Sequence, residues 1–84
     1  MRINFKYNNQ DYNFPDDKKH IEIQSAIRKR IETLLEPLND QLKKEPTGNI
    51  DVNYNEENPD EPSIQISGFS IDSTPKIITL LNTM

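Results

Sequence analysis

The sequence predicts an α+β domain: a two-layer sandwich with a four-stranded antiparallel sheet, helices on one face, and the element order β-β-α-β-β-α. Two segments alternate apolar and polar side chains, as the strands of a half-buried sheet do: residues 3–14, about a polar turn, and residues 50–71, on either side of a long acidic loop at 55–63. After each of them, apolar residues recur every three or four positions, as on the buried face of a helix. A chain of 84 residues suits one domain, 1–84.

The first alternating segment, residues 3–14, is typical of a β-hairpin with a polar turn at its middle. Pairing centred between positions 9 and 10 sets Tyr7 opposite Tyr12 and Phe5 opposite Phe14. All four rings would then share one face of the sheet, where cross-strand aromatic pairs stabilise a ribbon.

A long helix is expected next, and either Asp16 or Asp17 can cap it, although a start as late as Ser25 also fits the pattern. Pro37 falls inside the helical pattern, where it removes a backbone donor and clashes with the preceding turn. We expect a kink or a break near Leu35, and the continuing stripe favours a kink. The apolar stripe consists of Ile23, Ile27, Ile31, Leu34, Leu35, Leu38 and Leu42.

The third expected strand places Ile50, Val52 and Tyr54 toward the core. Asp51 and Asn53 alternate with them and are expected to face the solvent. The strand should therefore contribute one apolar and one polar face to the sheet.

The fourth expected strand, residues 64–71, changes its alternation at Gly68, and a bulge at this glycine would account for the change. A short helix is expected after it, with Ser73 or Thr74 as its cap and Pro75 in its first turn. These elements complete the predicted order.

The composition indicates a thin core and excludes several kinds of chemistry. Hydrophobic residues make up 32% of the chain and the mean hydropathy is −0.87, so added buried area from a dimer or a partner would help it fold. The absence of cysteine excludes disulfides, zinc–thiolate sites and thiol catalysis. Two glycines cannot form a P-loop or dinucleotide fingerprint, and the single histidine, His20, is expected at the surface or at the boundary of an element. We therefore expect a protein that is not an enzyme.

Location is predicted from the same features. No apolar run approaches the ~18 residues that span a bilayer, and the first residues alternate instead of forming a signal-peptide core. Small secreted domains are usually stabilised by disulfides, and this chain has no cysteine. We therefore expect a small soluble protein of the cytoplasm that does not contact a membrane.

Charge is unevenly distributed along the chain. Residues 1–45 carry nine Lys and Arg against eight Asp and Glu, whereas residues 46–84 carry one against six. Nucleic acid is therefore an unfavourable partner, and a protein with a basic surface is a favourable one. The candidate partner-binding residues are Asp51, Asn53, Tyr54, Glu56, Glu57, Asp60 and Glu61.

A calcium site is the nearest approach to a metal motif. Asp51, Asn53 and Asn55 match the first three ligand positions of an EF-hand loop. Glu56 stands where that loop needs glycine, and Pro62 stands where it needs a bidentate glutamate. We expect no metal and no cofactor.

The leading functional hypothesis is a non-enzymatic protein-interaction module: a small acidic inhibitor, or an immunity or anti-defence protein, that binds a basic surface such as that of a nucleic-acid enzyme. The ten asparagines and eleven isoleucines point weakly to an AT-rich genome, as in phages and mobile elements. The alternative is a homodimeric structural or assembly subunit joined through a sheet edge or a surplus apolar stripe.

A further alternative is a weak RNA- or ribosome-associated factor. The stretch from His20 to Arg28 resembles the strand-to-helix entry of ribosome hibernation factors, over less than a fifth of the chain. The resemblance implies contact with RNA through a basic face in residues 18–30. The acidic second half of the chain disfavours such contact.

Overall fold

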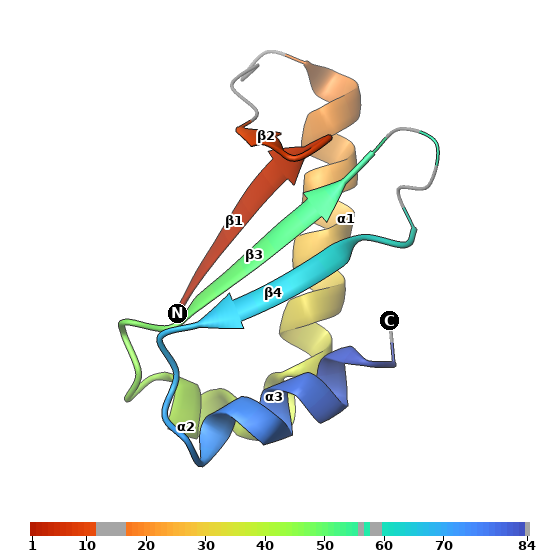
Figure 1. Cartoon of the computed structure of the whole chain (residues 1–84). Coiled ribbons are helices and arrows are strands. Elements are labelled where there is room, and N and C mark those ends of the chain that lie inside the picture. Colours follow the sequence, from red (N-terminus) through yellow and green to blue (C-terminus); the bar gives the residue numbers. More distant parts are fainter. Residues whose placement is uncertain (12–16, 56, 58–59, 84) are drawn as a thin grey trace.

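In the computed structural model, which describes residues 1–11, 17–55, 57 and 60–83, helices cover one face of a mixed sheet (Figure 1). The strands, in the sheet order β2-β1-β3-β4, are β1 (Arg2–Tyr7), β2 (Gln10–Asp11), β3 (Asn49–Tyr54) and β4 (Ser63–Ser67). The helices are α1 (Lys18–Leu34), the 3-10 turn η1 (Glu36–Leu38), α2 (Asn39–Leu42) and α3 (Ser73–Leu81).

The predicted antiparallel sheet and the order β-β-α-β-β-α are wrong. The central strands β1 and β3 pair in parallel, the described residues form three α-helices, and β2 adds only two residues to a sheet whose body is β1, β3 and β4. Because β2 is short, the chain stays near the end of β1. The 17 residues of α1 then carry it back by about 26 Å, past the length of the strands. Strand β3 therefore starts beside the start of β1 and runs the same way (Figure 1).

The first hairpin turns one residue earlier than expected, which shifts the strand register by two residues. Asn8-Asn9 has positive φ angles of 51° and 65°, a conformation that asparagine tolerates and that suits a two-residue hairpin turn. Tyr7 consequently pairs with Gln10, not with Tyr12. The two aromatic residues expected on the second strand, Tyr12 and Phe14, lie outside the described residues.

The long helix begins at an aspartate and breaks at a proline. Asp17 is confirmed as a cap, since its Oδ1 accepts hydrogen bonds from the backbone N–H groups of Lys19 at 3.1 Å and His20 at 3.4 Å. Helix α1 ends at Leu34, and Pro37 is the second residue of the 3-10 turn that follows, which is closed by a hydrogen bond from Leu38 N–H to the Leu35 carbonyl at 2.9 Å. The pattern is thus a break and not the kink that the continuing stripe favoured.

The core lies between the helices and the apolar face of the sheet. The register sets Ile50 beside Ile3 and Ile66, and Val52 beside Phe5 and Ile64, so that apolar side chains of three strands form one surface. Within the described part of the chain, no helix is long and apolar enough to cross a membrane. The buried apolar residues are Ile27, Ile31, Leu35, Leu42, Ile50, Val52, Tyr54, Ile77 and Leu81.

Gly68 ends β4 instead of forming the expected bulge. The strand stops at Ser67, and Gly68 has a φ of +76°, which turns the chain toward α3. A Cβ atom at this position would lie 2.1 Å from the Thr47 carbonyl oxygen, so only glycine fits.

The start of α3 is tied to the loop that precedes β3. Ser70 Oγ accepts a hydrogen bond from Ser73 N–H at 3.2 Å, whereas the expected caps Ser73 and Thr74 lie inside the helix. The Glu45 carboxylate accepts hydrogen bonds from Ser70 N–H at 2.6 Å and from the Ser73 hydroxyl. Gln41 donates a further hydrogen bond to this hydroxyl, whose residue is 1% exposed. These contacts join α2 to α3.

Replacing Gly68 with alanine tests the turn. Gly68→Ala should lower the free energy of unfolding by about 2 kcal/mol or more. Alanine is strained at the left-handed φ of this position, and its Cβ would clash with the Thr47 carbonyl. Urea denaturation measures the change, and Ser67→Ala at the neighbouring exposed position is the control. An unchanged midpoint in Gly68→Ala would contradict the assignment.

Acid should weaken the hydrogen bonds that the Glu45 carboxylate accepts from Ser70 and Ser73. Hydrogen bonds from Ser73 and Ser70 lower the pKa of Glu45 below its usual value near 4.5. The carboxylate therefore stabilises the fold above that value, and this contribution is lost as the pH falls through the lowered pKa. Glu45→Gln should lower stability at neutral pH and do so less at about pH 3.

Urea denaturation across this pH range measures the difference between Glu45→Gln and the unmodified protein. Glu36→Gln, the same substitution at an exposed glutamate in η1, is the control. A difference that stays constant with pH would contradict the role given to Glu45.

Candidate functional site

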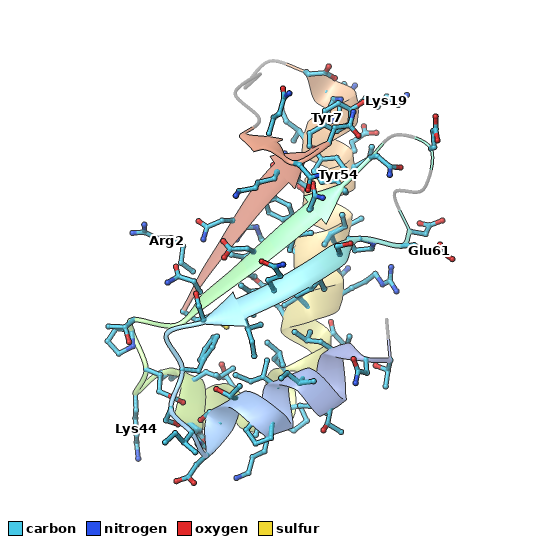
Figure 2. The ribbon with its side chains drawn as sticks, viewed as in Figure 1. Arg2, Tyr7, Lys19, Lys44, Tyr54 and Glu61 are labelled. Atoms are coloured by element: carbon cyan, nitrogen blue, oxygen red, sulfur yellow. The ribbon has the colours of Figure 1, made fainter. Side chains whose placement is uncertain are left out.

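The loop between β3 and β4 presents three exposed carboxylates, Glu57, Asp60 and Glu61. Figure 2 shows Glu61 beside the start of β4, pointing away from the sheet. No ion pair joins these three to a lysine or arginine of the described residues; Arg30 donates instead to the backbone carbonyl of Asp60 at 3.3 Å. The fourth expected carboxylate, Glu56, lies outside the described residues.

Asp51 and Asn53 lie on the open face of the sheet, as their alternation predicts. The Asp51 carboxylate accepts a hydrogen bond from the Asn4 side chain at 3.1 Å. The Asn53 amide donates to Asn9 Oδ1 at 2.7 Å and accepts from Asn9 N–H at 2.8 Å. These contacts link β3 to β1 and its turn. They border a shallow polar hollow of about 270 Å³ that is lined by Lys6, Asn9, Asp51, Val52, Asn53, Ser63 and Gln65.

Tyr54 points to the other side of the sheet and is only 2% exposed. Its hydroxyl accepts a hydrogen bond from Gln24 Nε2 at 2.9 Å and lies 3.0 Å from His20 Nδ1. Tyr54 is therefore not available to a partner. The other candidate residues do not form one continuous surface either, because Asp60 lines a groove against α1 while Asp51 is on the opposite, open face of the sheet.

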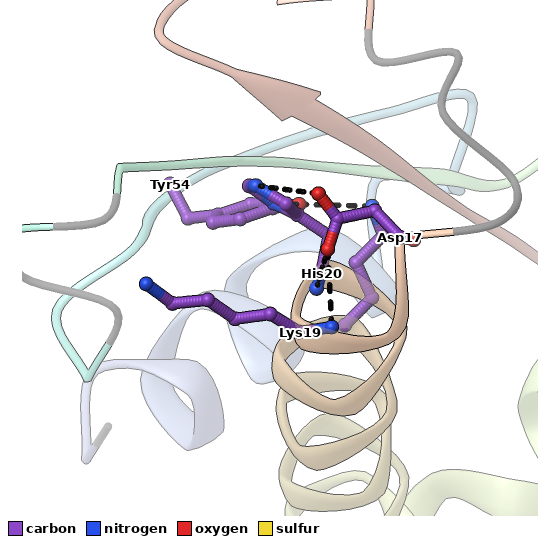
Figure 3. Close-up of polar contacts among 5 residues, drawn as sticks. Asp17, Lys19, His20 and Tyr54 are labelled. Atoms are coloured by element: carbon purple, nitrogen blue, oxygen red, sulfur yellow. Dashed lines mark hydrogen bonds and ion pairs between the residues drawn. The ribbon is translucent and has the colours of Figure 1, made fainter.

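His20 belongs to a buried cluster that the sequence analysis missed (Figure 3). It is 5% exposed, not at the surface, and its ring meets the ring of Tyr7 edge-on with centroids 4.7 Å apart. Its Nε2 lies 4.0 Å from Asp17 Oδ2. The signal was present, since His20, Gln24 and Ile27 occupy one helical face and extend the apolar stripe back by one turn.

The hydrogen bonds of this cluster are mutually consistent. Burial raises the pKa of Tyr54, so its hydroxyl stays protonated. A protonated hydroxyl has both a proton to donate and lone pairs to accept with, so it can share a hydrogen bond with His20 Nδ1 while it accepts one from Gln24 Nε2. Since each group satisfies another, the cluster fastens the first turns of α1 to the end of β3.

Comparison with known proteins provides no relative from which a function could be transferred. No protein-family model matches the chain, and neither a curated protein nor a solved structure matches it significantly. Among the residues that the structure describes, no group of three or more His, Asp or Glu side chains is placed to hold a metal ion. The exposed loop carboxylates and the open face of the sheet are the features from which function is argued.

Removing the Tyr54 hydroxyl should destabilise the protein. Tyr54→Phe leaves His20 Nδ1 and the Gln24 amide without this partner, at a cost of about 1–3 kcal/mol in the free energy of unfolding. Urea denaturation measures it. The double variant Tyr54→Phe/Gln24→Leu no longer contains the unpaired amide. Its loss of unfolding free energy should therefore be smaller than the sum of the losses in Tyr54→Phe and Gln24→Leu. Additive losses would contradict the pairing.

Proposed function

We propose that this protein is a non-enzymatic interaction module, a small acidic inhibitor or immunity-type protein that binds a basic surface of a partner protein, such as a nucleic-acid enzyme. The observation that carries the proposal is the exposure of Glu57, Asp60 and Glu61 without an ion pair to a described cation. Three carboxylates in so short a segment attract a basic surface over a distance of about 10 Å at ordinary salt.

The anchoring of the loop supports binding. Strands β3 and β4 pair directly with each other on either side of it, and Arg30 holds the Asp60 carbonyl from α1. A held loop loses less conformational freedom when it meets a partner than a free segment does. The absence of basic residues between Lys44 and Lys76 keeps the surrounding sequence acidic.

Burial of the polar clusters argues against catalysis. His20 and Ser73 are the side chains that most resemble catalytic groups, since each is hydrogen-bonded to a second ionisable residue, Tyr54 and Glu45 respectively. They are 5% and 1% exposed, so a substrate cannot reach them. Catalysis requires a reacting group within hydrogen-bonding distance of its substrate.

Neutralising the loop tests the proposal. The variant Glu57→Gln/Asp60→Asn/Glu61→Gln should retain partner proteins from an extract of the native host about tenfold less than the unmodified chain at low salt, because steering by charge is lost. Affinity capture at two salt concentrations, quantified by mass spectrometry, measures this.

The matched control is Glu32→Gln/Glu36→Gln/Asp40→Asn, which removes three exposed carboxylates from α1, η1 and α2. It changes the net charge by the same amount and should leave the captured proteins unchanged. Equal capture by the loop variant and the unmodified chain would refute the proposal.

A further inference from the structure

Strand β4 is an edge of the sheet that lacks the usual protection. In the described structure it pairs with β3 alone, whereas the other edge, β2, has only two residues. Natural proteins block exposed edges with lysine, proline, bulges or very short strands. The five residues of β4 contain none of these features. Its outer side can therefore accept another strand.

The sequence of β4, Ser63-Ile64-Gln65-Ile66-Ser67, reads the same in both directions. Two copies paired antiparallel about Gln65 set each serine opposite a serine and each isoleucine opposite an isoleucine. Because side chains alternate between the faces, every isoleucine then lies on the helix side and every polar residue on the open face. Antiparallel pairing of a strand with its own copy is two-fold symmetric, as an isologous interface requires. The palindrome adds that facing residues are of the same type.

A hollow with a mixed polar and apolar lining lies beside β4 on the helix side. Ile78, on α3, is 46% exposed there. A strand added to β4 would bring an isoleucine of the second copy over this hollow and cover Ile78. The hollow has a volume of about 260 Å³ and is lined by Pro62, Ile64, Ile78, Leu81 and Asn82.

We infer that β4 is a docking surface for a second copy of this chain, which pairs antiparallel about Gln65 and joins the two sheets into one. Among the described residues, neither β4 nor the lining of the hollow contains a charged side chain, so two chains of net charge −4 meet where they repel least. The pairing adds buried apolar area to a thin core. The loop carboxylates Glu57, Asp60 and Glu61 do not enter the contact, so the inference is independent of the proposed function.

Sedimentation of the full chain alone tests the inference over a concentration series. We expect a reversible monomer–dimer equilibrium with a Kd on the order of micromolar, since a contact of two short strands is small. The Kd should change little with salt, because no ion pair forms the contact.

Charge at the two-fold axis provides the decisive variants. Gln65→Lys places two lysines opposite each other and should raise the Kd about fivefold or more. The monomer tolerates the change, because residue 65 is exposed and pairs across from Asp51. Gln65→Glu should weaken the homodimer equally, and an equimolar mixture of the two variants should form a heterodimer, because each lysine then faces a glutamate.

Ile78→Ser should also raise the Kd severalfold, whereas Lys6→Gln, on β1 and away from the edge, is the control and should not change it. Circular dichroism confirms that each variant is folded. A chain that stays monomeric throughout the series, or a mixture of the Gln65 variants that forms no heterodimer, would overturn the inference. The loop variant Glu57→Gln/Asp60→Asn/Glu61→Gln should dimerise normally, so failure here and failure of the proposed function are distinguishable.

Discussion

The apolar faces of β1 and β3 share one helical layer, and the rest of the structure depends on their parallel pairing in matched register. Ile3 lies beside Ile50 and Tyr7 beside Tyr54, so the pair presents a continuous apolar surface to α1. A core this thin has little apolar area to lose, and a slip of one residue would turn every one of these side chains to the solvent. The length of α1 makes the pairing possible, because it returns the chain to the end of the sheet where β1 begins.

Two buried polar clusters hold the helical layer at its two ends. One fastens the start of α1 to β3 through His20 and Tyr54, and the other fastens α2 to α3 through Glu45 and Ser73. Each is satisfied by several hydrogen bonds, and a satisfied network inside a protein specifies a unique arrangement more sharply than apolar contacts alone. In a domain with few core residues, this specification compensates for the small apolar area.

The same topology determines which surfaces remain for partners. With β1 and β3 in the centre, β4 becomes an edge, and its loop projects three carboxylates beyond the sheet. The open face is occupied by side-chain hydrogen bonds such as that between Asn4 and Asp51, which brace the strands. The proposed contact with a basic protein and the proposed contact with a second copy therefore use neighbouring but separate regions.

The sequence by itself indicated the local features: the inward side chains of Ile50, Val52 and Tyr54, a helix cap at Asp16 or Asp17, the interruption near Pro37 and the acidic loop. Alternation, capping and charge are properties of neighbouring residues, so they are visible without a fold. Tertiary structure alone decided the direction of β3, the burial of His20 and the loss of Tyr54 from the candidate surface. All three depend on contacts between residues that are far apart in the sequence, and the spacing of apolar residues within one segment does not encode such contacts. The palindromic sequence of β4 is visible in the chain alone, but only the sheet order shows that this strand lies at an edge.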